Sequence, residues 1–222
     1  MQRTKVDLRF ANEQVTGLLL RPDNAKALYV FAHGAGVGMM HPSMVAYADG
    51  LAARDIATLR FNFPFMEKKT KRPDPPRIAQ VAVRAAVGAA GEMAKDLPLF
   101  AGGRSFGGRM TAQAQSVAPL PGVRGLAFLG FPLHPPGKPG IERAEHLKNV
   151  EIPMLFVSGS RDPLAEIELL KPMVKDLGKR ATLHVIDDAD HGLRVPAKSG
   201  RTAEQAQAEA LDAVAGWMKK LA

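Results

Sequence analysis

The sequence contains no cysteine among its 222 residues. Disulfide bonds, thiol nucleophiles and cysteine-ligated zinc or iron–sulfur sites are therefore excluded. No segment reaches the roughly 18 apolar residues that a membrane helix requires, and residues 1–7 lack the apolar core of a secretory signal. The spacings typical of metal and P-loop sites are also missing. We therefore expect a cytoplasmic protein with no membrane partner, no metal and no cofactor.

Charge of one sign is in excess, with 30 Lys and Arg against 22 Asp and Glu, for a formal net charge of +8. Such a balance raises the possibility of a polyanionic partner. The only dense basic run, residues 68–72, has no interleaved aromatic residues that could stack on bases, and the other basic residues are scattered. We therefore expect a small-molecule substrate rather than nucleic acid, bound by a monomer or homodimer.

Strand-like and helix-like segments alternate along the chain, which predicts a single α/β domain over residues 1–222. Two runs at residues 5–10 and 15–20, joined through residues 11–13, predict an antiparallel hairpin at a sheet edge. Six further apolar runs are typical of parallel strands buried on both faces, at residues 27–32, 57–61, 97–101, 124–129, 154–157 and 181–186. Helices are predicted over residues 43–54, 77–95, 106–117, 164–177 and 203–221.

The most informative segment is Gly-Arg-Ser-Phe-Gly at residues 103–107, between an apolar strand-like run and a predicted helix. This order is typical of a nucleophile elbow, in which a sharp turn exposes the central hydroxyl and requires small neighbours. Gly103 and Gly107 meet that requirement, so Ser105 is the candidate nucleophile. The alternative is a glycine-rich turn that binds phosphate.

A serine nucleophile needs a base and a group that orients the base. His191 follows the last predicted strand and should therefore emerge at the same sheet edge as Ser105. Asp162 follows the strand predicted at residues 154–157, and the chain order Ser105, Asp162, His191 is that of α/β-hydrolases. Three aspartates close to the histidine remain alternatives for the acid: Asp187, Asp188 and Asp190.

A second turn of small residues, Ala-His-Gly-Ala-Gly-Val-Gly at residues 32–38, follows another predicted parallel strand. It predicts an oxyanion hole built from the backbone N–H groups of Ala35 and Phe106, with Gly36 as the second choice for the former. A dinucleotide-binding turn is the alternative, but the glycine spacing differs. We expect four residues to border the substrate, although two of them, His33 and His134, could instead brace their loops: His33, Gly36, Phe63 and His134.

These motifs resemble the α/β-hydrolase superfamily, and more narrowly its small dienelactone-hydrolase-like members of the testis-expressed and NSL-complex-subunit type. The resemblance rests on residues 31–36, 59–64, 102–110, 130–137 and 158–162. It implies an eight-stranded, mostly parallel sheet with helices on both faces, no large lid domain, and a triad of Ser105, Asp162 and His191.

Two functions follow from this reading. The first is a serine hydrolase that cleaves an ester or thioester, with a shallow acyl pocket for short or medium chains bordered by residues 61–65, the proline-rich loop at residues 66–76 and Phe106. The second is a non-catalytic scaffold or binding protein, because some relatives look like scaffolding subunits and a fold does not fix a function.

Overall fold

The computed structural model describes residues 1–10, 13–70 and 72–222. Within them, eight strands form one sheet in the order β1-β2-β4-β3-β5-β6-β7-β8. The strands are β1 (Gln2–Phe10), β2 (Glu13–Arg21), β3 (Ala27–Ala32), β4 (Ile56–Phe61), β5 (Leu99–Arg104), β6 (Val123–Leu129), β7 (Met154–Gly159) and β8 (Ala181–Ile186). The predicted turn at Ala11 and Asn12, and Lys71 of the basic run, lie outside the described residues.

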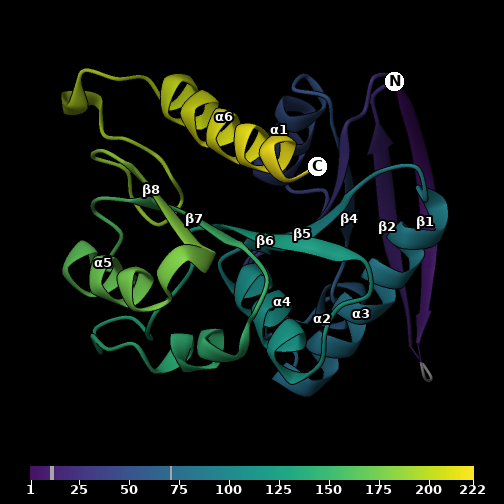
Figure 1. Cartoon of the computed structure of the whole chain (residues 1–222), viewed down its shortest axis with the longest axis horizontal. Coiled ribbons are helices and arrows are strands. Elements are labelled where there is room, and N and C mark those ends of the chain that lie inside the picture. The colour runs from purple at the N-terminus through teal and green to yellow at the C-terminus, as the bar shows by residue number, and fades with distance from the viewer. Residues whose placement is uncertain (11–12, 71) are drawn as a thin grey trace.

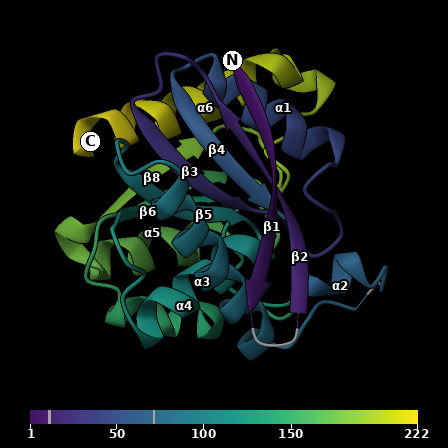
Figure 2. The same ribbon diagram turned by 90° about the vertical axis from the view of Figure 1, so that its right-hand side faces the viewer.

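The sheet is mostly parallel, as predicted. β2 runs antiparallel to both of its neighbours, β1 and β4, and every other pair of adjacent strands is parallel. The hairpin of β1 and β2 therefore stands at one edge of the sheet, where Figure 2 shows it facing the viewer. This order places the carboxyl ends of the parallel strands along one common edge.

Helices cover both faces of the sheet, which explains why every residue of β3, β4 and β7 is buried. Helices α1 (Pro42–Ala52) and α6 (Ala203–Leu221) lie on one face, and α3 (Pro76–Met93), α4 (Phe106–Val117) and α5 (Ile167–Asp176) on the other (Figure 1). Two large apolar clusters, one for each face, form most of the core, and a third contains only three residues. The fold class and the two-faced helical cover are thus confirmed.

Several element boundaries differ from the prediction. Strand β5 continues to Arg104, three residues past the predicted end, because Gly102 and Gly103 carry it on with φ near +150°. The predicted helix at residues 164–177 begins only at Ile167, after a turn. Four short elements have no predicted counterpart: the helix α2 (Pro64–Glu67) and the 3₁₀ helices η1 (Glu142–Asn149), η2 (Gly178–Arg180) and η3 (Ala197–Ser199).

These short helices could not be predicted from hydrophobic periodicity, because a segment of three to eight residues is too short to show a helical repeat. Such segments are stabilised mainly by tertiary contacts. Both α2 and η1 lie in the long connections that follow β4 and β6. In the part of the chain that the structure describes, no helix is both long and apolar enough to cross a membrane.

Candidate active site

Ser105 stands alone between the end of β5 and the start of α4. Its φ of 48° and ψ of −114° fall in a region that L-residues rarely occupy. Backbone hydrogen bonds hold it there: the Ser105 N–H donates to the Leu129 carbonyl at 3.2 Å, and the Arg109 N–H donates to the Ser105 carbonyl at 3.1 Å. A strained backbone held from both sides projects the hydroxyl from the sheet edge.

The two glycines flanking this turn are needed for close packing against β3. A Cβ on Gly103, where φ is +156°, would lie 2.3 Å from the Ala32 carbonyl oxygen. A Cβ on Gly107 would lie 2.5 Å from the carbonyl oxygen of His33. Real Cβ atoms do not approach backbone so closely, so only glycine lets the turn sit against the end of β3.

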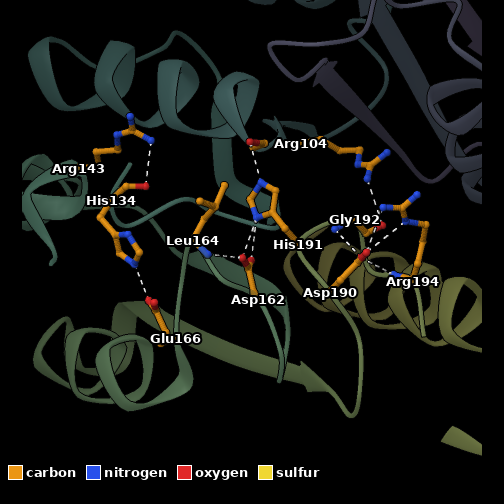
Figure 3. A network of polar contacts seen from close by, with 11 residues as sticks. Arg104, His134, Arg143, Asp162, Leu164, Glu166, Asp190, His191, Gly192 and Arg194 are labelled. Atoms are coloured by element: carbon orange, nitrogen blue, oxygen red, sulfur yellow. Dashed lines mark hydrogen bonds and ion pairs between the residues drawn. The ribbon is translucent and has the colours of Figure 1, made fainter. Parts of the chain in front are cut away.

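The structure brings Ser105 and His191 together from positions 86 residues apart. The Ser105 Oγ donates a hydrogen bond to His191 Nε2 at 2.8 Å. On the far side of the ring, Nδ1–H donates to the Asp162 carboxylate, at 2.8 Å to Oδ2 and 3.0 Å to Oδ1. Figure 3 shows His191 between its partners, with Asp162 below the ring. The proton thus sits on Nδ1, and Nε2 is free to accept from the serine.

Asp162 is the carboxylate that reaches His191. Its side chain is fully buried, and Oδ1 also accepts a hydrogen bond from the Leu164 N–H at 2.8 Å. Of the three alternatives, Asp190 bonds instead to the backbone of Gly192 and to Arg194, while Asp187 and Asp188 are exposed. The geometry therefore separates Asp162 from its sequence neighbours.

The loop after β3 approaches the serine from the other side. A Cβ on Gly34 would lie only 3.8 Å from the Ser105 Cβ, and Ala35 lines the same cavity as Ser105 and Phe106. Phe106 is the first residue of α4, so its N–H has no partner within the helix. Ala35 and Phe106, the predicted oxyanion-hole residues, therefore border the same cavity as Ser105.

The cavity beside Ser105 has a volume of about 350 Å³. Its walls combine apolar and charged side chains from several separate segments: Ala35, Pro73, Asp74, Pro76, Ser105, Phe106, Arg109, Pro132, Arg143 and Leu164. The predicted border of residues 61–65 is instead buried in the core, because Phe61, Phe63 and Phe65 pack on one another and on Phe106. Of the expected border, Phe106 and the proline-rich loop remain.

His33 lies beneath the cavity rather than on its wall. Its Nδ1–H donates to the Gly34 carbonyl at 2.8 Å, and its Nε2 accepts from the Phe63 N–H at 3.0 Å. Burial is the main reason that the pKa of His33 falls from 6.5 to about 4, so the ring is neutral. Both His33 and Phe63 are completely buried, so the structure gives them a bracing position instead of the expected contact with substrate.

His134 is also completely buried, and its contacts hold in place the connection between β6 and η1 (residues 130–141). Its Nδ1 bonds to the Pro135 carbonyl at 2.8 Å, and its Nε2 bonds to the carboxylate of Glu166, which raises the pKa of the imidazole against the effect of burial. The expected substrate contact is therefore replaced by a loop anchor. Gly36, the fourth expected border residue, lines a neighbouring cavity with Met66 and Lys69.

The sequence reading missed three charged residues of the cavity wall, which are Asp74, Arg109 and Arg143. Arg109 could have been found, because it follows Ser105 by four residues and so lies on the same side of α4. No sequence spacing relates Arg143 to Ser105 in this way, so its place on the cavity wall could not be predicted. Among the described residues, no group of three or more His, Asp or Glu side chains is placed to hold a metal ion.

Comparison with known proteins identifies the family of this chain. The sequence of residues 25–219 matches a family described as an alpha/beta hydrolase domain. The chain belongs to the α/β-hydrolase family. The predicted resemblance is thereby confirmed over most of the chain.

Three solved structures share the fold of this α/β-hydrolase domain. A dienelactone hydrolase from Anabaena variabilis is 21% identical with a TM-score of 0.74, covering 99% of this chain and 96% of its own. An alpha-beta serine hydrolase homologue from Coxiella burnetii is 19% identical with a TM-score of 0.74, and the coverage is 99% and 97%. A serine hydrolase without a lid from Xanthomonas campestris is 17% identical with a TM-score of 0.73, and the coverage is 97% and 95%.

Proposed function

We propose that this chain is a serine hydrolase that cleaves a carboxylic ester or thioester through an acyl-enzyme on Ser105. The observation that carries the proposal is the 2.8 Å hydrogen bond from Ser105 Oγ to His191 Nε2. Serine hydroxyl is a weak nucleophile at neutral pH, and a base at this distance activates it. The α/β-hydrolase family and its structural neighbours, which include serine hydrolases, fit the same reaction.

In the first half of the reaction, His191 Nε2 takes the proton of Ser105 as Oγ attacks the carbonyl carbon. The N–H groups of Ala35 and Phe106 stabilise the negative charge on the carbonyl oxygen. His191 then passes its proton to the departing alkoxide or thiolate, which leaves the acyl group on Ser105. Asp162 stabilises the imidazolium and holds the ring through Nδ1.

In the second half, water enters in place of the leaving group and gives a proton to His191 Nε2. The hydroxide attacks the acyl carbon, and the same N–H groups stabilise the second tetrahedral intermediate. When this collapses, the proton returns to Ser105 Oγ and the carboxylic acid is released. The reaction uses substrate, water, these three side chains and the two backbone N–H groups.

Turnover of p-nitrophenyl acetate tests this function. We expect a burst of nitrophenol stoichiometric with enzyme if deacylation is the slower step, and saturable steady-state turnover in either case. The Ser105→Ala variant should lose turnover while keeping the circular dichroism spectrum and melting temperature of the wild type. Equal turnover by the two proteins would contradict the proposal, and an inert wild type would favour the scaffold alternative.

A further inference from the structure

Two arginines on the wall of the Ser105 cavity have no anionic partner. Arg109 lies on α4 and Arg143 on η1, and both line the cavity of about 350 Å³ that contains Ser105. Among the ion pairs of the described residues, none involves either guanidinium. Isolated cations near the protein interior are costly and are ordinarily paired.

Arg109 is the more unusual of the two. Its Nε is buried and has no hydrogen-bond partner. The charged group that most affects it is another cation, Arg143, which together with burial lowers its pKa. The imidazole of nearby His146 is neutral, because burial and the charge of Arg109 lower its pKa to about 4. It therefore supplies no charge that could pair with Arg109.

Arg143 is fixed in position by its own contacts. One guanidinium nitrogen, Nη1, donates to the His134 carbonyl at 3.0 Å, and His134 is in turn bonded to Glu166 (Figure 3). The remaining carboxylate on the cavity wall, Asp74, accepts a hydrogen bond from the Phe65 N–H at 2.9 Å and pairs with neither arginine. The cavity wall therefore carries two cations that have no anionic partner among the described residues.

We propose that Arg109 and Arg143 bind a carboxylate carried on the acyl part of the substrate, so that the enzyme cleaves half-esters or half-thioesters of short dicarboxylic acids. This proposal rests on the proposed function. An arginine fork matches the two oxygens of a carboxylate, and a carboxylate between two arginines would remove the unpaired charges.

The acyl side is indicated by the position of His191. Because His191 protonates the leaving group, that group must lie on the histidine side of Ser105. The cavity with the two arginines is lined by Ser105, Phe106 and Ala35 but not by His191. It is therefore placed to receive the other half of the substrate.

The position of Arg109 on α4, relative to Ser105, indicates the length of the acyl group. Arg109 lies four residues after Ser105, about 6 Å along the helix axis, and long helical side chains lean back toward the N-terminus. The Arg109 Cζ accordingly lies 6.0 Å from the centre of the Phe106 ring, beside the nucleophile. This reach suits a carboxylate separated from the scissile carbonyl by roughly two or three methylene groups.

Two esters of matched shape test the proposal. Monoethyl succinate and ethyl 4-methylpentanoate have similar acyl outlines, but only the first ends in a carboxylate. We expect wild-type kcat/KM to be at least 10-fold higher for the succinate ester. That ratio should fall at least 10-fold in Arg109→Met and in Arg143→Met, and less in Arg109→Lys. Arg124→Met, which removes a surface charge at the start of β6, should leave it unchanged. A wild-type ratio of one or less, or a ratio that both variants retain, would overturn the proposal.

A binding measurement separates this proposal from the proposed function. Titration calorimetry of Ser105→Ala with monoethyl succinate should show binding that is absent with ethyl 4-methylpentanoate and at least 10-fold weaker in Ser105→Ala/Arg109→Met. If the wild type cleaves no ester at all, hydrolase function fails, yet Arg109-dependent binding of monoethyl succinate would still support the carboxylate site. Absence of that binding overturns the site, even if neutral esters are cleaved.

Discussion

Arg104, the residue before Ser105, donates a hydrogen bond from Nη2 to the carbonyl of Gly192, the residue after His191, at 3.1 Å. The same guanidinium bonds to Ser43 Oγ at 2.9 Å and lies over the ring of Tyr47. One side chain thus links the turn that carries Ser105 to the loop that carries His191. Figure 3 shows this link beside the contacts of His191.

We therefore predict that Arg104 is a positioning residue. Arg104→Met should lower kcat for p-nitrophenyl acetate by about 10-fold to 100-fold, the value of one charge-assisted hydrogen bond, with little change in KM. Arg104→Lys should recover part of the loss. Arg54→Met, which removes a similar link between α1 and α6, should lower the melting temperature without this effect on kcat. Equal kinetic losses in the two variants would mean that Arg104 acts only through stability.

The acid assignment makes its own prediction. Asp162→Asn should lower kcat by about 10⁴-fold, because the amide would hold His191 in the wrong tautomer and could not stabilise an imidazolium. His191→Ala should cost a similar factor. Asp187→Asn, an exposed change in the same region, is the matched control and should remain active. Should Asp162→Asn keep more than a tenth of wild-type turnover, the acid would lie elsewhere.

Acid sensitivity should follow from the buried His33. The pKa of His33 is about 4 in the folded protein and 6.5 in the unfolded chain. Between pH 4 and pH 6.5 the unfolded chain therefore binds a proton at His33 that the folded protein does not. Stability from this group is therefore present above pH 6.5 and is lost as the pH falls toward 4, by up to about 3 kcal/mol.

Chemical denaturation across pH 4 to 7 measures this effect. His33→Gln keeps an acceptor for the Phe63 N–H but cannot titrate, so its free energy of unfolding should vary less with pH than that of the wild type. It should also be less stable at pH 7, where the native ring is neutral and fully bonded. Parallel pH profiles for the two proteins would show that His33 does not titrate in this range.

We predict opposite effects on stability for Gly→Ala changes at Gly107, beside Ser105, and at Gly88, in α3. Gly107→Ala should destabilise the fold by about 3 kcal/mol or more, because its Cβ would meet the His33 carbonyl oxygen at 2.5 Å. Gly88→Ala, in α3 with open space around it, should stabilise by up to about 1 kcal/mol. Thermal unfolding measures both, and a harmless Gly107→Ala would refute the close packing described for the turn.

The parts of the fold that the sequence anticipated depend on local pattern. Apolar runs such as β3 and β7 are buried on both faces and separated by amphipathic helices, so strand order along the chain and helical cover could be predicted. The meeting of Ser105, Asp162 and His191 could also be predicted, because each follows a strand-like run and parallel strands end at one edge.

What the sequence could not supply depends on contacts between distant segments. Whether His134 binds substrate or braces a loop is decided by Glu166, which comes from a different connection. The position of Arg143 depends on the path of the connection between β6 and η1. That path is held by the His134–Glu166 pair and by the bond from Arg143 to the His134 carbonyl. Phe63 is fully buried because it packs against the rings of His33, Phe61 and Phe106, which come from three separate segments of the chain. Residue type and spacing do not encode such contacts.

The most direct measurement of the central claim is intact-protein mass spectrometry after treatment with a fluorophosphonate, followed by peptide mapping. The account predicts one adduct per chain on Ser105, none in Ser105→Ala, and labelling at least 10³-fold slower in His191→Ala, since the hydroxyl would lose its base. An unlabelled wild type, or an adduct on any other residue, would contradict it.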